Sequence, residues 1–128
     1  MIADRKITLP TAHRTNIATA DAGPIISDDT GALTLDNQLH VVCCVECSAG
    51  GAAGTICLAR WDKDGKFIGI TEMQSFEAHS AWQSGRGYVA PPLIFDVMGA
   101  YKVKALVDTL SGGNITNLYL SPLSLYNY

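Results

Sequence analysis

The sequence contains little charge. Charged residues make up 16% of its 128 positions, against about 25% in an average soluble domain. The nine lysines and arginines are scattered along the chain, whereas a nucleic-acid site needs them gathered into a basic stripe. The formal net charge is −3 at pH 7. We therefore expect no nucleic-acid partner, and a largely neutral surface that is suited to burial against other proteins.

Long apolar runs are missing as well. No stretch approaches the roughly 20 apolar residues that span a bilayer, and residues 1–11 lack the apolar block of a secretory signal. The cysteines lie close together, at Cys43, Cys44, Cys47 and Cys57. This clustering differs from the dispersed framework of a small secreted domain. We expect a protein made in a cytoplasm, with no membrane partner.

Helical periodicity is not convincing in any part of the chain, but period-2 alternation is clear after Leu39. In residues 39–47 one face is apolar throughout, as in a strand with one buried side. Short apolar runs separated by glycine-rich turns follow. The pattern predicts an all-β fold, a single β-sandwich of jelly-roll-like form. The expected strands are residues 39–47, 55–61, 67–73, 88–97, 100–110 and 115–120.

Two turns suggest how the strands pair. Residues 48–54 form a flexible glycine-rich connection, and if they close a hairpin, Val45 lies near Cys57. Residues 62–66 carry a glycine where a positive φ is needed and aspartates that cap their own backbone, which predicts a hairpin between the strands on either side. Two consecutive prolines within residues 88–97 cannot donate to a ladder and place that strand at an edge or a bulge.

The first third of the chain has a different pattern. Residues 1–37 contain short apolar pairs separated by Thr, Asp, Asn, Gly and Pro, without a sustained period. A disordered tail is depleted in branched apolar residues, whereas this segment has several that favour burial. We divide the chain into an extended N-terminal arm, residues 1–37, and a β-sandwich domain, residues 38–128. The arm is expected to pack along its own domain or a neighbouring subunit, and a partly ordered tail is the alternative.

The cysteines allow three interpretations. Cys44 and Cys47 have the CxxC spacing of a zinc ligand pair, and Cys47 with Cys57 is a candidate disulfide. A zinc knuckle needs a tight turn between its ligands, but the strand pattern sends Cys44 and Cys47 to opposite faces. We therefore expect reduced, buried cysteines that act as small hydrophobic residues, with no metal and no cofactor.

No constellation for catalysis is visible. The three histidines lie in unrelated segments, and acid–base chemistry requires His79 near a carboxylate such as Glu77, which the spacing does not indicate. No serine lies in a GxSxG elbow, and residues 62–65 lack the other ligands of a calcium loop. We therefore expect a protein that is not an enzyme, with catalysis at His79 as the alternative.

Function is then expected to lie in surfaces. Residues 77–87 break the strand pattern for longer than a compact turn needs, which makes them a candidate contact loop. Trp82 and Tyr88 beside this loop leave open a carbohydrate-binding module, although packing in a core or an interface also explains aromatic residues. The candidate interface comprises Ile2, Ile7, Leu9, Ile17, Ile25, Ile26, Trp82, Arg86, Tyr126 and Tyr128.

The architecture of the whole chain resembles the small accessory structural proteins of tailed-phage virions, notably the decoration or cement proteins of capsid shells. The likeness rests on the arm, the β core at residues 39–120, low charge, reduced cysteines and the hairpin ARWDKDGKFIGI. The resemblance implies a virion protein, made in the host cytoplasm, that binds the major capsid protein or other virion subunits. It also implies a homotrimer that stabilises the assembled shell. A head-to-tail connector or a tail protein is the alternative within the virion.

Overall fold

The chain is built of β-strands. The computed structural model describes residues 11–21 and 28–123; within these ranges there is no helix, and hence none long and apolar enough to cross a membrane. The strands are β1 (Arg14–Ile17), β2 (Leu33–Thr34), β3 (His40–Cys47), β4 (Ala53–Trp61), β5 (Phe67–Ile70), β6 (Gln74–Glu77), β7 (Tyr88–Val89), β8 (Leu93–Asp96), β9 (Lys102–Ser111) and β10 (Ile115–Leu123). The all-β prediction is confirmed.

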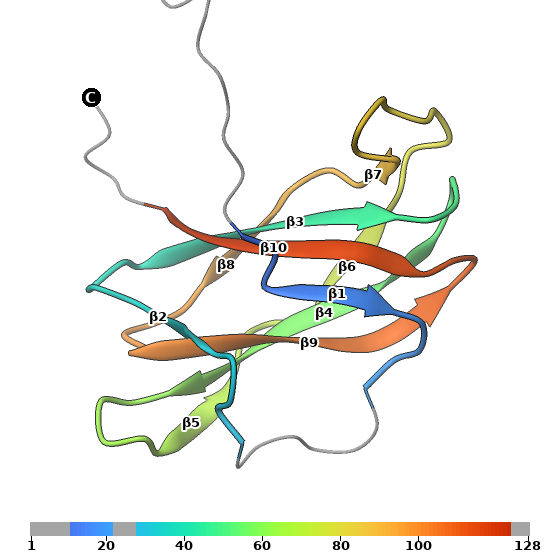
Figure 1. Ribbon diagram of the computed structural model, residues 1–128. Coiled ribbons are helices and arrows are strands. Elements are labelled where there is room, and N and C mark those ends of the chain that lie inside the picture. The colour runs from blue at the N-terminus through green and yellow to red at the C-terminus, as the bar shows by residue number, and fades with distance from the viewer. Residues whose placement is uncertain (1–10, 22–27, 124–128) are drawn as a thin grey trace, which may run out of the picture.

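The strands form two antiparallel sheets (Figure 1). Sheet A has the strand order β1, β10, β3, β7. Strand β8 lies on the same edge of β3 as β7 but pairs with the opposite end of β3. Sheet B has the strand order β2, β9, β4, β5. Strand β6 lies on the same edge of β4 as β5 but pairs with the opposite end of β4. Pro91 and Pro92 separate β7 from β8, both at the edge of sheet A, which confirms the prediction of a segment at an edge or a bulge.

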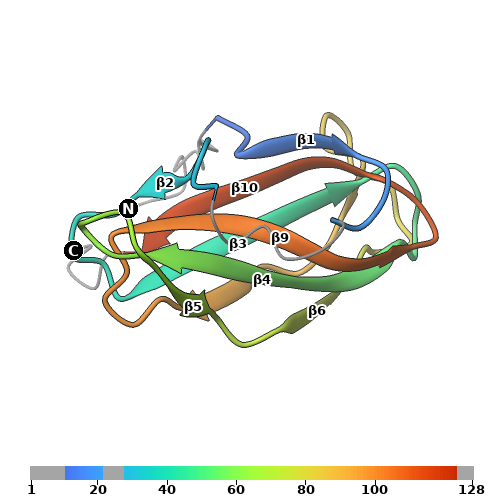
Figure 2. The same ribbon diagram turned by 90° about the horizontal axis from the view of Figure 1, so that it is seen from below.

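One hydrophobic core lies between the two sheets (Figure 2). Alternate residues of β3, Val41, Cys43 and Val45, are completely buried in it. The predicted alternation is confirmed from Val41 to Cys47, whereas Leu39, predicted on the same buried face, precedes β3 and is 52% exposed. Ile56 on β4 and Val107 on β9 are equally buried and come from the opposite sheet. Fully burying a side chain of this size contributes about 1.5–3 kcal/mol, so the two inner faces hold the sheets together.

The predicted hairpin at residues 62–66 is confirmed. β4 pairs with β5, and the Asp62 N–H donates to the Lys66 carbonyl oxygen at 2.8 Å. The Asp62 carboxylate accepts the N–H groups of Asp64 and Lys66, each at 2.9 Å. Gly65 has φ 81°, the left-handed conformation that glycine adopts without strain.

The predicted approach of Val45 to Cys57 is wrong, because β3 and β4 lie in different sheets. β3 already has neighbours on both of its edges, β10 on one and β7 and β8 on the other. Residues 48–52 therefore cross from sheet A to sheet B instead of closing a hairpin. A glycine-rich link signals that the chain reverses, but it does not specify whether the next strand lies beside the first or across the core.

Parts of the segment predicted as an arm contribute strands to both sheets. β1 pairs with β10 and β2 pairs with β9. Ile17 and Leu35 are 5% and 3% exposed and belong to the core. In residues 11–21 and 28–37 the chain thus packs along its own domain, and Asn37 does not separate the sheets from what precedes them. Residues 1–10 and 22–27 lie outside the described residues.

Residues 13–21, which we call the strap, close part of the edge of β9. β2 pairs only with Lys102 and Val103 of that strand. Further along, His13 Nε2 accepts the Ala105 N–H at 3.2 Å and Arg14 Nη1 donates to the Ala105 carbonyl at 3.2 Å. Asp21 accepts the Val107 N–H through its carboxylate and donates its own N–H to the Val107 carbonyl, both at 2.8 Å. These hydrogen bonds, most of them from side chains, take the place of a neighbouring strand along this part of β9. They protect it because an open strand edge can pair with another chain and cause aggregation.

The strap makes stability depend on pH. Burial, followed by the positive charges of Arg14 and Lys104, lowers the pKa of His13 to about 4. Burial alone would raise the pKa of Asp21, but hydrogen bonds from Arg14 and Val107 outweigh it and hold that pKa below its ordinary value. The unfolded chain takes up a proton at His13 near pH 6.5, where the folded chain does not, so stability falls between about pH 6.5 and 4. Protonation of Asp21 weakens the strap further at lower pH.

We expect acidification from pH 7 to 4.5 to lower the free energy of unfolding through His13 by about 1 kcal/mol, after allowance for its partial exposure. The substitution His13→Gln keeps an acceptor near Ala105 but cannot titrate. Urea unfolding at the two pH values should show a smaller loss for this variant than for the wild type. Equal losses in both proteins would rule out His13 as a source of the pH dependence.

Candidate functional site

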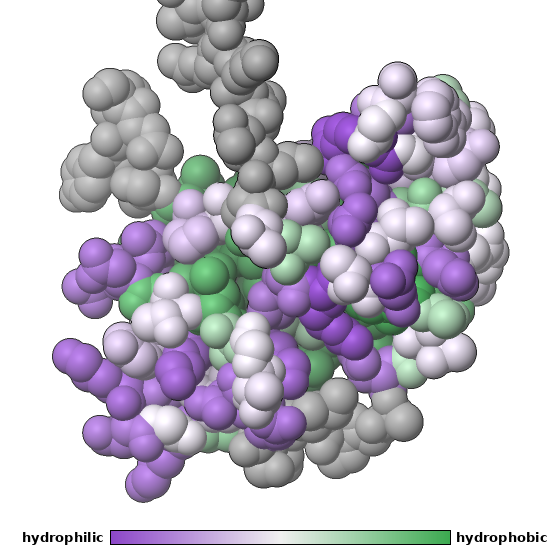
Figure 3. Space-filling model, in the orientation of Figure 1, coloured by the Kyte–Doolittle hydropathy of each residue, from purple (hydrophilic) through white to green (hydrophobic). Residues whose placement is uncertain are grey.

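A groove lies over the outer face of sheet A, where β3 ends and β7 begins. It forms because residues 78–87, which connect β6 to β7, fold back over β3. This loop projects from the body beside β7 in Figure 1 and stands out in the space-filling view of Figure 3. The groove has a volume of about 340 Å³, within the roughly 300–1,000 Å³ of small-ligand sites. Its lining includes Glu46, Ser48, Trp82, Arg86, Thr116 and Asn117.

A tight turn shapes the loop. The Gln83 N–H donates to the Gly87 carbonyl at 2.7 Å, and the Gly87 N–H donates back to the Gln83 carbonyl at 2.8 Å. Gly87 has φ 77°, and a Cβ atom there would lie 3.1 Å from the Cys47 carbonyl oxygen. The absence of a side chain therefore allows the loop to approach β3 closely, and the turn fixes the intervening Arg86 over the sheet.

Glu46 is the buried anion at the bottom of the groove. It lies on the outer face of β3 and is only 3% exposed. Arg86 Nε donates to its Oε2 at 2.7 Å, and Asn117 Nδ2 donates to its Oε1 at 3.0 Å. Burial, followed by the charge of Glu46, raises the pKa of the neighbouring Tyr119. Each carboxylate oxygen thus has a partner, as a buried charge requires.

Two features of the groove stay available to a ligand. Arg86 uses only its Nε on Glu46, and its two terminal nitrogens donate to no acceptor in residues 11–21 and 28–123. Its side chain is 36% exposed. Trp82 on the same loop is 61% exposed, unusual for so large an aromatic side chain. The groove therefore offers a cationic donor beside an aromatic face.

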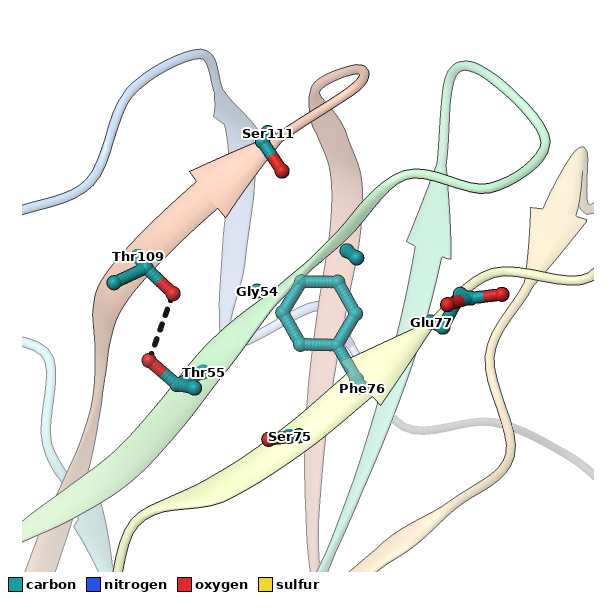
Figure 4. Close-up of a pocket in the computed structure, with 8 residues that line it drawn as sticks. Gly54, Thr55, Ser75, Phe76, Glu77, Thr109 and Ser111 are labelled. Carbon is teal, nitrogen blue, oxygen red and sulfur yellow. Dashed lines mark hydrogen bonds between the residues drawn. The ribbon is translucent and has the colours of Figure 1, made fainter.

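A second, shallower depression lies on the outer face of sheet B (Figure 4). Thr55 and Thr109 on neighbouring strands share a hydrogen bond of 2.9 Å between their hydroxyl groups. Ser75 and Glu77 line it on the β6 side, and the Phe76 ring lies against the backbone of β4. Hydroxyl groups that satisfy each other on an open surface offer little to hold a ligand, so we place no site here.

A third surface feature is apolar. Six large hydrophobic side chains between 39% and 59% exposed lie on or beside β5, β6, β8 and the start of β3. These elements meet at one long edge of the two sheets, where Gln74 Nε2 donates to the Ile94 carbonyl at 2.6 Å and the Val97 N–H donates to the Leu39 carbonyl at 3.0 Å. We call the exposed hydrophobic residues that flank this edge on the two sheets the apolar edge: Leu39, Ile68, Ile70, Met73, Ile94 and Met98.

Arg60 lies beneath the apolar edge and is 9% exposed. Its terminal nitrogens donate to the carbonyl oxygens of Ile68 at 3.1 Å and Val97 at 3.4 Å. No carboxylate among the described residues pairs with it, and its Nε has no hydrogen-bond partner there. The edge therefore carries a positive charge that is not neutralised within the described chain.

The structure brings together only two of the predicted interface residues, Trp82 and Arg86. Ile17 is buried in the core, so the chain itself occupies the surface that was assigned to a partner. Trp61, by contrast with Trp82, is 1% exposed and packs edge-to-face on Phe67 with ring centroids 6.0 Å apart. The predicted interface residues Ile2, Ile7, Leu9, Ile25, Ile26, Tyr126 and Tyr128 lie outside the described residues.

Three of the four cysteines are buried, as predicted. Cys43, Cys47 and Cys57 are at most 3% exposed, and all four thiols are free. Cys44 and Cys47 point to opposite faces of β3, which confirms the prediction from alternation. Burial raises the pKa of Cys43 to about 12 and that of Cys47 to about 11. Within the described residues no three His, Cys, Asp or Glu side chains gather as a metal site.

Sequence reasoning missed Glu46, Asn117 and Arg60. Glu46 did leave a signal, because it is the one charged residue in residues 41–47, a run that is otherwise apolar. Its partners Arg86 and Asn117 lie 40 and 71 positions away, and only the sheet order brings them together. Comparison of the chain with protein-family models, with curated proteins and with solved structures found no match.

Proposed function

We propose that this protein is a non-enzymatic structural protein of a tailed-phage virion, made in the host cytoplasm, which decorates the capsid by binding assembled capsid subunits. The observation that carries the proposal is the apolar edge. Several large hydrophobic side chains exposed on neighbouring edge strands favour coverage by another protein. The low content of charge supports the same conclusion, because a neutral surface loses little hydration when it is buried.

We further infer a jelly-roll β-sandwich. The support is the nested pairing of the strands: β1 with β10, β2 with β9, β3 with β7 and β8, and β4 with β5 and β6. If the two short strands at each shared edge are taken as one, eight strands pair first with last towards the middle, as in a jelly roll. Viral capsid proteins and lectins are among the proteins with this arrangement.

The apolar edge also suits self-association as a homotrimer. A cyclic trimer needs two different complementary patches on each subunit, and the edge offers residues from two sheets, such as Ile70 on β5 and Ile94 on β8. Arg60, which lies beneath the edge, adds the requirement that the partner surface carry a negative charge. A partner surface that is apolar and brings one carboxylate near Arg60 would neutralise the unpaired cation.

Introducing charge at the edge tests the proposal. The double substitution Ile70→Asp and Met98→Asp replaces side chains that are 46% and 59% exposed, so the fold should be retained. We expect light scattering to give three times the chain mass of 13.6 kDa for the wild type and a monomer for the variant. Binding to capsid shells of the encoding phage should weaken at least tenfold.

The matched control places the same two charges elsewhere. Ala18→Asp and Thr19→Asp change exposed residues that follow β1, on the opposite side of the molecule. This variant should keep the mass and the shell binding of the wild type. If the edge variant behaves like the control, the apolar edge is not the contact surface.

A further inference from the structure

We propose that the groove under residues 78–87 binds a carboxylate-bearing sugar, a pyranose ring with an acidic group such as a uronic acid. The inference rests on groove chemistry alone and stands apart from the virion assignment. Three observations support it: the hydrogen-bond partners already used by Glu46, the free terminal nitrogens of Arg86 and the exposure of Trp82.

The two charged groups of the groove differ in what they leave free for a ligand. Glu46 is its only charged acceptor, and Arg86 and Asn117 already occupy both of its oxygens. The Thr116 hydroxyl donates to the Glu46 carbonyl at 3.0 Å, and Ser48 Oγ accepts the Asn114 N–H at 2.9 Å. The charged group that remains for a ligand is the donor fork of Arg86. A ligand group that only accepts hydrogen bonds, above all a carboxylate, complements such a site.

The Arg86 guanidinium is held ready for this role. Its Nε bond to Glu46 at 2.7 Å and the turn closed by Gln83 and Gly87 fix its direction. Two terminal nitrogens in a planar fork then match the two oxygens of a carboxylate. Glu46 partly offsets the charge of Arg86, so affinity must come from geometry and from a second contact rather than from net charge.

Trp82 supplies the second contact. An aromatic face favours a sugar ring, whose C–H groups pack against it while the hydroxyl groups stay solvated. Tyr88, the other aromatic residue of the groove, is partly buried and packs against the core, so it does not act as a second free platform. The site therefore offers one exposed aromatic face and one guanidinium group, which are enough to bind a single acidic ring of a longer glycan.

NMR titration of the full chain with methyl β-D-glucuronide tests the inference. We expect saturable shifts of amides at residues 46–48, 82–88 and 116–117, and at least tenfold weaker binding of the neutral methyl β-D-glucoside. Trp82→Ala should weaken glucuronide binding at least tenfold. Arg86→Lys keeps a cation beside Glu46 but removes the fork, and it should have a similar effect without loss of the fold. Met98→Ala, an equally exposed residue far from the groove, is the matched control.

Three outcomes would overturn the inference. The first is no saturable shift with glucuronide, and the second is unchanged binding in the folded Trp82→Ala and Arg86→Lys variants. The third is equal binding of a carboxylate without a ring, N-acetylglutamate methylamide, which would indicate a site for an acidic protein side chain. None of these results bears on binding to capsid shells through the apolar edge, so failure here and failure of the proposed function can be distinguished.

Discussion

Replacing Arg86 with methionine should lower the free energy of unfolding by about 3 kcal/mol, because it leaves a buried carboxylate without its cation. Glu46 is 3% exposed, and the Arg86 bond at 2.7 Å is its only ion pair among the described residues. An exposed ion pair is worth at most about 1 kcal/mol, so the size of the loss reports the burial of Glu46. Urea unfolding followed by circular dichroism measures it.

A double-mutant cycle separates the buried charge from the loss of packing. In a Glu46→Gln background the buried group is neutral and still bonds to Asn117, so Arg86→Met should cost less than half as much. Lys63→Met, a charge removal at an exposed residue of the β4–β5 turn, serves as the control and should change stability by less than about 0.5 kcal/mol. An equal cost of Arg86→Met in both backgrounds would contradict a role for the Glu46 charge.

Gly54→Ala should be at least as damaging, with an expected loss of about 3 kcal/mol or more. A Cβ atom at Gly54 would lie 2.0 Å from the Thr109 carbonyl oxygen and 3.0 Å from the Phe76 ring. Overpacking usually costs about 1–3 kcal/mol, but here the obstacle is backbone of the neighbouring strand. The pairing of β4 with β9 also shifts by a bulge just beyond Thr55.

Gly65→Ala provides the comparison for Gly54. Gly65 has φ 81° with nothing within 4 Å of the added atom, so only the left-handed conformation is penalised, by about 1–2 kcal/mol. Thermal unfolding should therefore give a clearly lower midpoint for Gly54→Ala than for Gly65→Ala. Equal midpoints would show that β9 moves aside at little cost.

Local patterns predicted the strands well and their partners poorly. Period-2 alternation located β3 and β9, and turn chemistry at residues 62–66 identified the hairpin between β4 and β5. These signals come from neighbouring residues. The sheet that each strand joins depends on contacts between residues far apart in the chain, such as β1 with β10. A strand shows the same alternation whether it lies beside the preceding strand or in the opposite sheet.

The same limit applies to the surfaces. Trp82 and Arg86 were found because their loop breaks the strand pattern. Glu46 has apolar neighbours on both sides, and its role becomes visible only through its hydrogen bonds to Arg86 and Asn117. The apolar edge was missed because each of its members looks like an ordinary strand residue. Exposure follows from the position of β5 and β8 at the sheet edges, which sequence alone does not determine.

The structure also changes how an N-terminal arm should be tested. Deletion of residues 1–30 would remove β1, the strap and the core residue Ile17, so loss of binding would follow from loss of the fold. Deletion of residues 1–10 alone leaves every described strand intact. This shorter truncation is the variant that separates attachment from folding.

Co-sedimentation of the full chain with tailed-phage capsid shells is the sharpest test of the proposed capsid binding. We expect wild-type protein to pellet with the shells up to a fixed, saturable number of copies. The Ile70→Asp and Met98→Asp variant should stay in the supernatant at the same concentration. Wild-type protein that stays in the supernatant at every concentration when shells are present would contradict capsid decoration. An edge variant that pellets as fully as the wild type would contradict binding through the apolar edge.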